Sequence, residues 1–347
     1  MKTKTVKIGN ITIGGGSRIA VQSMTNIPAH NTAAVTEQIN RLAEAGCDIV
    51  RFAVPDRETA ENVDKIVGAV SVPLVADIHF DYRLALMCIE RGISKIRINP
   101  GNIGGEDRAA AVAKAAKAKG IPIRIGVNGG SLEKGLLEKC GGNLAMAMVE
   151  SAKRHIEILN RYDFDDIVLS MKSSDVRTTI EAYRLAHERF NYPLHLGVTE
   201  AGTVKSGIIK SAIGIGSLLA DGIGDTIRVS LTGDPVKEVE AARLILRALD
   251  MEPDSIQVVS CPTCGRTKID LISIANRVTE ETEKLKGKLK VAVMGCVVNG
   301  PGEAKDADIG IAGGDGCAVL FKKGEIIKKL PENEIVDALM DEIRRMI

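Results

Sequence analysis

Short apolar, β-branched runs alternate along the chain with longer segments whose apolar residues recur every three to four positions. The intervening segments, such as 32–46 and 176–190, have the periodicity of amphipathic helices, and the short runs are typical of buried strands. The runs lie at 18–24, 48–55, 74–80, 95–101, 121–128, 167–173, 194–202 and 226–235. Eight strand–helix units in about 250 residues predict an α/β fold of the TIM-barrel type. A doubly wound open sheet is the alternative.

The pattern changes after residue 251. A strand, a cysteine pair, a helix at 270–287, a strand at 290–295, a third cysteine, a hairpin at 317–330 and a final helix at 333–347 follow in that order. These elements predict a small α+β domain with its own core. We therefore expect a substrate-binding barrel over residues 1–251 and a second domain over residues 252–347.

Composition narrows the possible functions. The 347 residues include 46 Lys and Arg against 45 Asp and Glu, so no net charge favours nucleic acid or an anionic membrane. Aromatic residues make up 3% and Trp is absent, which leaves little to stack on nucleobases. No signal peptide or apolar span is evident, so a cytoplasmic protein is expected. Seven cysteines in such a chain favour ligands or buried thiols over disulfides.

Polar side chains gather toward the carboxyl ends of the predicted barrel strands. Because side chains alternate along a strand, Arg97 shares a face with Asn99, and Arg124 shares one with Asn128. The carboxyl ends of the strands build the active site of a TIM barrel. The residues predicted to form this site are Arg51, Asp77, His79, Arg97, Asn99, Arg124, Asn128, Ser170, Lys172, His195, Thr199, Arg228 and Ser230.

Several cations converging inside a barrel need a counter-ion, because an unpaired buried charge is costly. A small polyanion, most simply a diphosphate held by Arg forks and Asn donors, meets that need. The alternative is pairing within the protein, with Asp77, Glu200 and Asp234 as the partners. Glu200 is also a candidate proton donor to a leaving group or a contact of a substrate hydroxyl, or else a partner of Lys205.

Three cysteines of the second domain have the spacing of metal ligands. Cys261 and Cys264 form a C-x-x-C pair, and Cys296 follows about thirty residues later. A structural zinc site would need a fourth Cys or His, but no histidine follows His195. Glu303 follows a Gly-Pro-Gly turn that can bend the chain back toward the metal. If the metal site is an iron–sulfur cluster, Glu303 would be its fourth ligand. A carboxylate binds the iron of such a cluster less firmly than a thiolate does, so that iron would be exchangeable.

Seven segments together resemble the 4-hydroxy-3-methylbut-2-enyl diphosphate synthase family. They are VQSMTN, KIRINPGN, IGVNGGSLE, LSMKSSD, HLGVTEAG, SCPTCGRT and MGCVVNGPGEAKDADIG, and the similarity runs in order from about residue 5 to 340. The resemblance implies a TIM barrel followed by a [4Fe-4S] domain similar to part of sulfite and nitrite reductases. It also implies a homodimer with the active site shared between subunits.

The resemblance further implies reductive ring opening of 2-C-methyl-D-erythritol 2,4-cyclodiphosphate to the allylic diphosphate, with ferredoxin or flavodoxin as the electron donor. Cys261, Cys264, Cys296 and Glu303 match the cluster ligands of the family. Its substrate-binding motifs contain Arg51, Arg97, Asn99, Arg124, Asn128, Lys172, His195 and Lys205.

Two rival functions remain open at this point. A pterin- or corrinoid-dependent barrel transferase accounts for the barrel but not for Cys261, Cys264 and Cys296. A zinc-stapled binding protein accounts for those cysteines but not for the cationic barrel.

Overall fold

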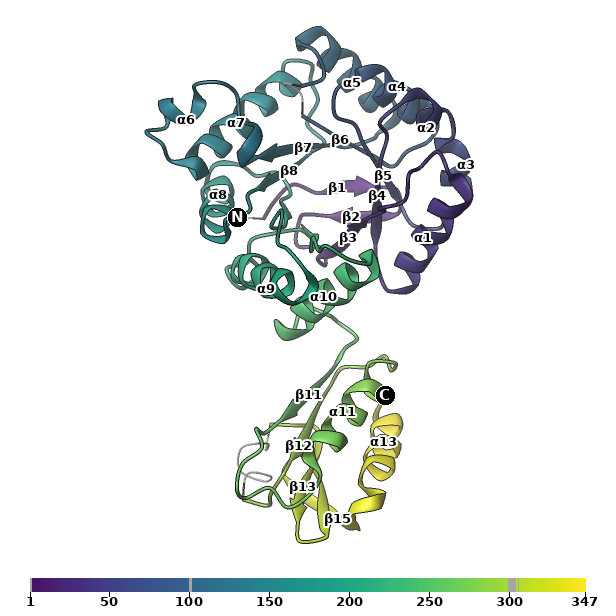
Figure 1. Ribbon diagram of the computed structural model, residues 1–347, viewed down its shortest axis with the longest axis vertical. Coiled ribbons are helices and arrows are strands. Elements are labelled where there is room, and N and C mark those ends of the chain that lie inside the picture. Colours follow the sequence, from purple (N-terminus) through teal and green to yellow (C-terminus); the bar gives the residue numbers. More distant parts are fainter. Residues whose placement is uncertain (1, 100–101, 299–303, 305) are drawn as a thin grey trace. The chain divides into compact units, whose positions relative to one another are not determined.

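The computed structural model describes residues 2–99, 102–298, 304 and 306–347, and Figure 1 shows its elements along the chain. The chain divides into two compact units, Met1–Met251 and Glu252–Ile347. None of the helices formed by the described residues combines the length and the apolar character needed to cross a bilayer.

The first unit contains eight parallel strands that form a barrel. Its strands are β3 (Ala20–Met24), β4 (Ile49–Ala53), β5 (Leu74–Asp77), β6 (Lys95–Ile98), β7 (Ile123–Asn128), β8 (Ile167–Lys172), β9 (His195–Leu196) and β10 (Thr226–Ile227). They pair in the order β8-β7-β6-β5-β4-β3-β10-β9. A parallel bridge from Leu169 on β8 to Leu194 next to β9 closes the ring. The predicted TIM barrel is confirmed, because each predicted run contains one of these strands.

Helices surround the strands, as Figure 1 shows. They are α1 (Thr32–Glu44), α2 (Arg57–Glu61), α3 (Val63–Gly68), α4 (Tyr82–Glu90), α5 (Glu106–Lys119), α6 (Leu136–Lys139), α7 (Leu144–Asn160), α8 (Val176–Arg189), α9 (Val204–Ala220) and α10 (Pro235–Ala248). Asp and Asn side chains begin many of them; the carboxylate of Asp175, for example, accepts the N–H of Thr178 at the start of α8. The apolar helix faces and the outward side of the strands form one continuous core.

A hairpin of β1 (Val6–Ile8) and β2 (Ile11–Ile13) closes the amino end of the barrel. Val6, Ile8 and Ile13 pack against the first inward-facing side chains of the strands, among them Ile49 and Val75. After the hairpin, residues 14–16 are three glycines, all with positive φ, which other residues adopt only with strain. They form the turn that leads toward β3, the first barrel strand.

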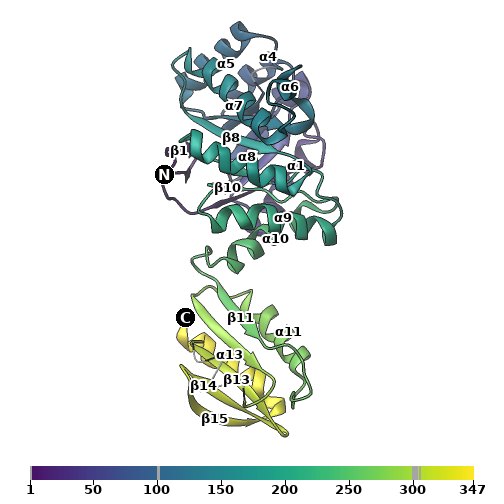
Figure 2. The ribbon, with the colours of Figure 1, turned by 90° about the vertical axis from the view of Figure 1, so that its left-hand side faces the viewer.

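The second unit is a five-stranded sheet, and the two α-helices formed by its described residues lie on one face of the sheet. The strands are β11 (Ile256–Ser260), β12 (Leu289–Met294), β13 (Ile309–Gly314), β14 (Cys317–Lys322) and β15 (Glu325–Pro331), and the helices are α11 (Leu271–Thr282) and α13 (Ile335–Met346). The first three strands are parallel and the last two antiparallel, and Figure 2 shows them from a second direction. The helices bury their apolar faces on Val291, Val293, Ile309 and Ile311.

Two details of this unit differ from the sequence prediction. The helix expected to reach residue 287 ends at Thr282, and β13 was not predicted at all. The run IGIAGG is rich in glycine, which usually disfavours a strand. Here the glycine has a packing reason, since a Cβ at Gly310 would lie 2.7 Å from the backbone oxygen of Ala292 on the neighbouring strand.

Candidate active site

A pocket of about 180 Å³ opens at the carboxyl ends of the barrel strands. Strands β4 to β8 and the segments after β9 and β10 contribute its lining residues, and all of them belong to the predicted set. They are Arg51, Asp77, His79, Arg97, Arg124, Asn128, Ser170, Lys172, Thr199, Arg228 and Ser230. Register explains the convergence: Arg97 lies opposite Arg124, and Asn128 lies opposite Lys172.

Four other predicted residues lie outside this lining. Asn99 is largely buried just after β6, and Lys205 is exposed in the first turn of α9. Glu200 is exposed beside Thr199, in a left-handed backbone conformation with φ of 52°. His195 is fully buried and contacts the pocket through Lys172, whose Nζ lies 3.4 Å from its Nε2.

Asp77 is the carboxylate at the centre of one side of the pocket. Its Oδ1 accepts a hydrogen bond from Arg97 Nη1 at 3.1 Å, and its Oδ2 lies 3.7 Å from Arg51 Nε and 3.6 Å from His79 Nε2. Burial raises the pKa of Asp77, but the charges and hydrogen bonds of Arg51, His79 and Arg97 outweigh it and hold that pKa well below its usual range. Asp77 therefore stays ionised and orients two arginines.

Arg124 is the most deeply buried arginine of the pocket. Its side chain is 1% exposed, and neither Nε nor Nη1 has a hydrogen-bond partner in the described part of the chain. Burial, together with Arg51 and Arg97, lowers its pKa, and burial with Arg228 does the same to Lys172. An unpaired, buried guanidinium facing a cavity requires an anionic ligand, because its desolvation is otherwise uncompensated.

The alternative is that Asp77, Glu200 and Asp234 pair with the barrel cations. Of these three carboxylates, only Asp77 does so in the described residues. Asp234 caps α10 and pairs with the exposed Arg41 at 2.8 Å, away from the barrel interior. No ion pair in the described residues joins Glu200 to Lys205 or to a pocket cation. The second buried counter-ion is Glu238 on α10, which pairs with Arg228. The sequence offers little signal for it, because Glu240, two positions further along the same helix, is an acidic residue that is exposed.

Two glycines, which the sequence did not mark as functional, make room for the cations. A Cβ at Gly126 on β7 would lie 2.5 Å from Arg97 Nε, and one at Gly197 would lie 2.6 Å from Lys172 Nζ. Below the pocket, Lys95 is fully buried with its Nζ 3.3 Å from Gln22 Oε1. The interior is thus polar well below the strand ends, where a TIM barrel ordinarily packs branched apolar residues.

Replacing Gly126 by alanine should displace the guanidinium of Arg97 without disturbing the strand. A hydrogen bond to a charged group contributes about 1.5–3 kcal/mol, so loss of the Arg97 contact should weaken binding of inorganic pyrophosphate roughly 10- to 150-fold, as measured by isothermal titration calorimetry. Gly216→Ala is the matched control, because a Cβ there meets nothing within 4 Å and the residue lies within α9. Equal affinities of Gly126→Ala and Gly216→Ala would contradict this role.

The predicted cysteine ligands follow neighbouring parallel strands of the second unit. Cys261 comes directly after β11 and Cys296 two residues after β12, and the N–H of Gly295 donates to Cys261 Sγ at 3.2 Å. Cys264 is exposed, and hydrogen bonds from the backbone and side chain of Arg266 lower the pKa of its thiol. By contrast, Cys47 and Cys88 are buried in the barrel core, where burial raises the pKa of each to about 12.

The fourth predicted ligand, Glu303, lies outside the described residues. Within the described part of the chain, no three Cys, His, Asp or Glu side chains stand close enough together to hold a metal ion. The two cysteine-bearing loops are nevertheless tied to each other, since Lys268 N–H donates to the oxygen of Gly295 at 3.0 Å. A cavity of about 330 Å³ beside them is lined in part by Cys261, Met294 and Ala304.

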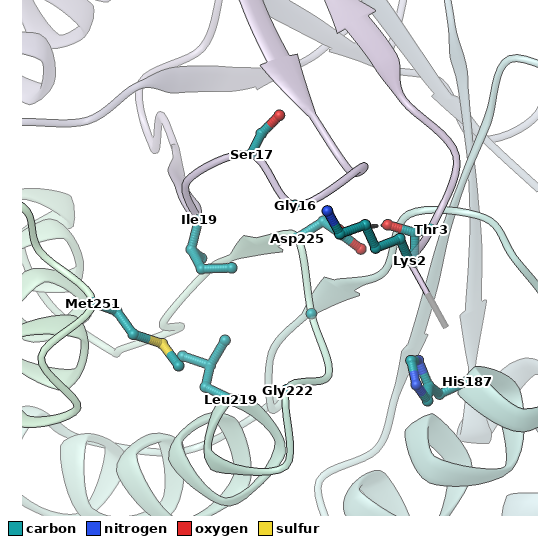
Figure 3. Close-up of a pocket in the computed structure, with 11 residues that line it drawn as sticks. Lys2, Thr3, Gly16, Ser17, Ile19, His187, Leu219, Gly222, Asp225 and Met251 are labelled. Carbon is teal, nitrogen blue, oxygen red and sulfur yellow. Dashed lines mark hydrogen bonds between the residues drawn. The ribbon is translucent and has the colours of Figure 1, made fainter.

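A further pocket of about 240 Å³ lies at the opposite, amino end of the barrel strands (Figure 3). The carboxylate of Asp225, just before β10, accepts hydrogen bonds there from Thr3 Oγ1 at 2.7 Å and from the N–H of Leu194 at 2.8 Å. These bonds tie the N-terminal segment to the barrel. In TIM barrels this end serves stability, so we assign it no part in the reaction.

An eight-stranded α/β barrel with a cationic pocket at the carboxyl ends of its strands defines the first unit as an enzyme-type barrel for a small anion. The GcpE TIM-barrel domain matches residues 3–243, and the GcpE protein C-terminal domain matches residues 257–345. The chain belongs to the GcpE family, whose two domains account for both units.

Curated relatives are similar over the full length. The 4-hydroxy-3-methylbut-2-en-1-yl diphosphate synthase (flavodoxin) of Ruminiclostridium cellulolyticum is 59% identical over 345 residues, covering 99% of this chain and 98% of that protein. The protein of the same name from Caldanaerobacter subterraneus subsp. tengcongensis is also 59% identical over 345 residues, covering 99% of this chain and 97% of its own. The predicted resemblance is therefore confirmed, and the chain is an enzyme of the oxidoreductase kind.

Solved structures show the barrel fold alone. Dihydropteroate synthase from Xanthomonas albilineans, in complex with 7,8-dihydropteroate, covers 72% of this chain and 99% of its own at 14% identity and a TM-score of 0.52. The dihydropteroate synthase of Stenotrophomonas maltophilia covers 72% of this chain and all of its own at 15% identity, with a TM-score of 0.52. Sequence identity this low does not indicate a shared function. The family assignment does not support either rival function, the pterin- or corrinoid-dependent transferase or the zinc-stapled binding protein.

Proposed function

We propose that the chain converts 2-C-methyl-D-erythritol 2,4-cyclodiphosphate into 4-hydroxy-3-methylbut-2-enyl diphosphate by reductive ring opening. Two electrons are consumed, a C–O bond to phosphate breaks, and one hydroxyl leaves as water. The observation that carries the proposal is the buried guanidinium of Arg124, whose Nε and Nη1 have no hydrogen-bond partner among the described residues, in a pocket of about 180 Å³. A compact cyclic diphosphate supplies the negative charge that this pocket lacks. The relatives at 59% identity are named for the enzyme that forms this product.

The barrel residues bind and orient the diphosphate. Five cations line the pocket, and Asp77 holds Arg51 and Arg97 in place before the substrate arrives. Arg124 and Lys172 then gain their counter-ion from phosphate oxygens, while Asn128, Ser170 and Ser230 offer further hydrogen bonds. Buried charge contacts of this kind hold the ring in one orientation, so the bond that must break always faces the same way.

Glu200 is the proposed proton donor to the departing hydroxyl. It follows Thr199, which lines the pocket, and its φ of 52° is a conformation that a non-glycine residue adopts at some cost. Loss of a hydroxyl in a reduction requires a proton on the leaving oxygen, and Glu200 is the carboxyl group next to Thr199 that we assign to its delivery.

The second unit is the proposed site of a [4Fe-4S] cluster held by Cys261, Cys264, Cys296 and Glu303. Two features of the described residues suit it: the N–H of Gly295 donates to Cys261 Sγ, and Arg266 favours the thiolate of Cys264. When bound, the cluster supplies electrons one at a time. A carboxylate ligand leaves one iron more readily exchanged than a fourth thiolate would.

A reduction that consumes two electrons requires an electron-donor protein. We propose a flavodoxin as the electron donor, because the relatives' names include flavodoxin, with a ferredoxin as the other candidate. A homodimer would share the active site between subunits. Thiolate-bound iron requires a reducing compartment, which favours the cytoplasm.

The test is anaerobic reconstitution of the chain with iron and sulfide, followed by turnover of the cyclic diphosphate with reduced flavodoxin. We expect a brown protein that absorbs at about 400 nm, and we expect it to release 4-hydroxy-3-methylbut-2-enyl diphosphate. A colourless protein that binds zinc, or a brown one that leaves the cyclic diphosphate intact, would refute the assignment. The first outcome would contradict the proposed iron–sulfur cluster, and the second would contradict the proposed substrate.

A further inference from the structure

Glu238 is a buried carboxylate directly behind the pocket, although it does not line it. It lies in the first turn of α10 and is 4% exposed. A carboxylate this deeply buried requires partners that offset its desolvation, so the identity of those partners indicates what it does.

The partners of Glu238 all lie on or next to the pocket strands. Its Oε2 accepts from Ser23 Oγ at 3.0 Å and from Arg228 Nε at 3.3 Å. Its Oε1 accepts from the N–H of Leu231 at 3.0 Å, and Arg228 Nη2 lies 3.3–3.4 Å from both oxygens. The carboxylate thus accepts hydrogen bonds from the Nε and Nη2 groups of Arg228, and Nη1 stays available to other partners.

Arg228 requires such a clamp because of its surroundings. It lines the pocket beside Arg51, Arg124 and Lys172, and like charges this close repel one another. Burial and the neighbouring arginines lower the pKa of Lys172, whereas the charge of Glu238 acts in the opposite direction. Without Glu238, the guanidinium of Arg228 would gain by turning away from its cationic neighbours before any substrate arrived.

The bond to Leu231 extends the effect to the backbone. Leu231 follows Ser230, a lining residue, in the middle of the segment between β10 and α10. One carboxylate therefore fixes both the direction of an arginine and the path of the backbone beside it.

We infer that Glu238 is a positioning residue for substrate binding, which acts through Arg228 to hold the guanidinium and the adjoining backbone in the geometry that receives a phosphate group. This inference rests on the proposed function for the identity of the substrate. It assigns Glu238 no contact with that substrate.

The first test compares Glu238→Gln with Glu240→Gln in the reconstituted full chain. Glu240 lies on the same helix, is exposed and pairs only with Lys237 in the described structure, so its variant controls for charge and helix stability. We expect Glu238→Gln to raise KM for the cyclic diphosphate about 10- to 100-fold, with kcat changed less than about threefold, because a misdirected phosphate contact weakens ground-state and transition-state binding alike. Unchanged KM would overturn the inference.

A double-mutant cycle separates positioning from a structural role. In an Arg228→Met background, Glu238→Gln should cause no further loss of affinity for inorganic pyrophosphate, measured by calorimetry on the same full chain. An equal loss with and without Arg228 would overturn the inference, because Glu238 would then act by another route. Glu238→Asp keeps the charge but shortens the reach, and it should show the same dependence on Arg228 even where Glu238→Gln folds poorly.

The two proposals fail differently. If the chain binds pyrophosphate but leaves the cyclic diphosphate unreacted, the proposed function is wrong, and the pyrophosphate cycle still decides the role of Glu238. If the cyclic diphosphate reacts and the cycle shows no coupling, Glu238 is not a positioning residue and the proposed function stands.

Discussion

Serine at any one of positions 261, 264 and 296 should abolish both iron binding and turnover. A hydroxyl is a poor replacement for thiolate on iron, so the loss should be nearly complete rather than graded. Iron and acid-labile sulfide analysis after anaerobic reconstitution measures the first effect, and product formation from the cyclic diphosphate measures the second. Full iron content with normal turnover in any of the three variants would refute the ligand assignment.

The matched control is Cys317→Ser in the same unit. Cys317 begins β14 and is partly buried there, so its variant should keep both iron and activity. Glu303→Ala completes the series: three thiolates should still hold the cluster, and activity should fall far more than iron content. Loss of the cluster in Cys317→Ser, with Glu303→Ala nearly active, would instead show that four thiolates close the site.

Arg124→Met should have opposite effects on binding and on stability. Removing a desolvated charge contact should weaken binding of the cyclic diphosphate by roughly 2–5 kcal/mol. In the free protein the same change removes a buried cation whose Nε and Nη1 have no partner in the described residues, and a chain of similar volume replaces it. The free energy of unfolding should therefore rise by about 1–3 kcal/mol. Calorimetric binding and denaturant unfolding measure the two effects.

The control for Arg124 is Arg41→Met on the barrel surface. Arg41 forms an exposed ion pair with Asp234, and such pairs contribute about 0–1 kcal/mol, so this variant should change neither quantity by much. A loss of stability in Arg124→Met would mean that the guanidinium is paired within the protein and that the pocket is a structural ion cluster. Unchanged affinity would mean that the anion binds elsewhere.

Much of the barrel and its pocket was predictable, because both depend on local periodicity. Strand and helix periods differ, so eight strand–helix units were readable from the sequence. Side-chain alternation then placed Arg97, Arg124 and Lys172 on the inward face. The pocket lining contains only residues from the predicted set, because parallel strands of a barrel bring their carboxyl ends to one place whatever their separation along the chain.

Long-range contacts account for what local pattern missed. Glu238 resembles Glu240, the other acidic residue of α10, until that helix packs against β3 and brings Glu238 to Ser23, 215 positions away. Gly126 and Gly197 leave room for side chains on neighbouring strands, and Gly310 of β13 leaves room for the backbone of β12. Periodicity reports which face of an element is buried. It carries no information on which residue of another element lies opposite, because that depends on packing distances set when the whole chain has folded.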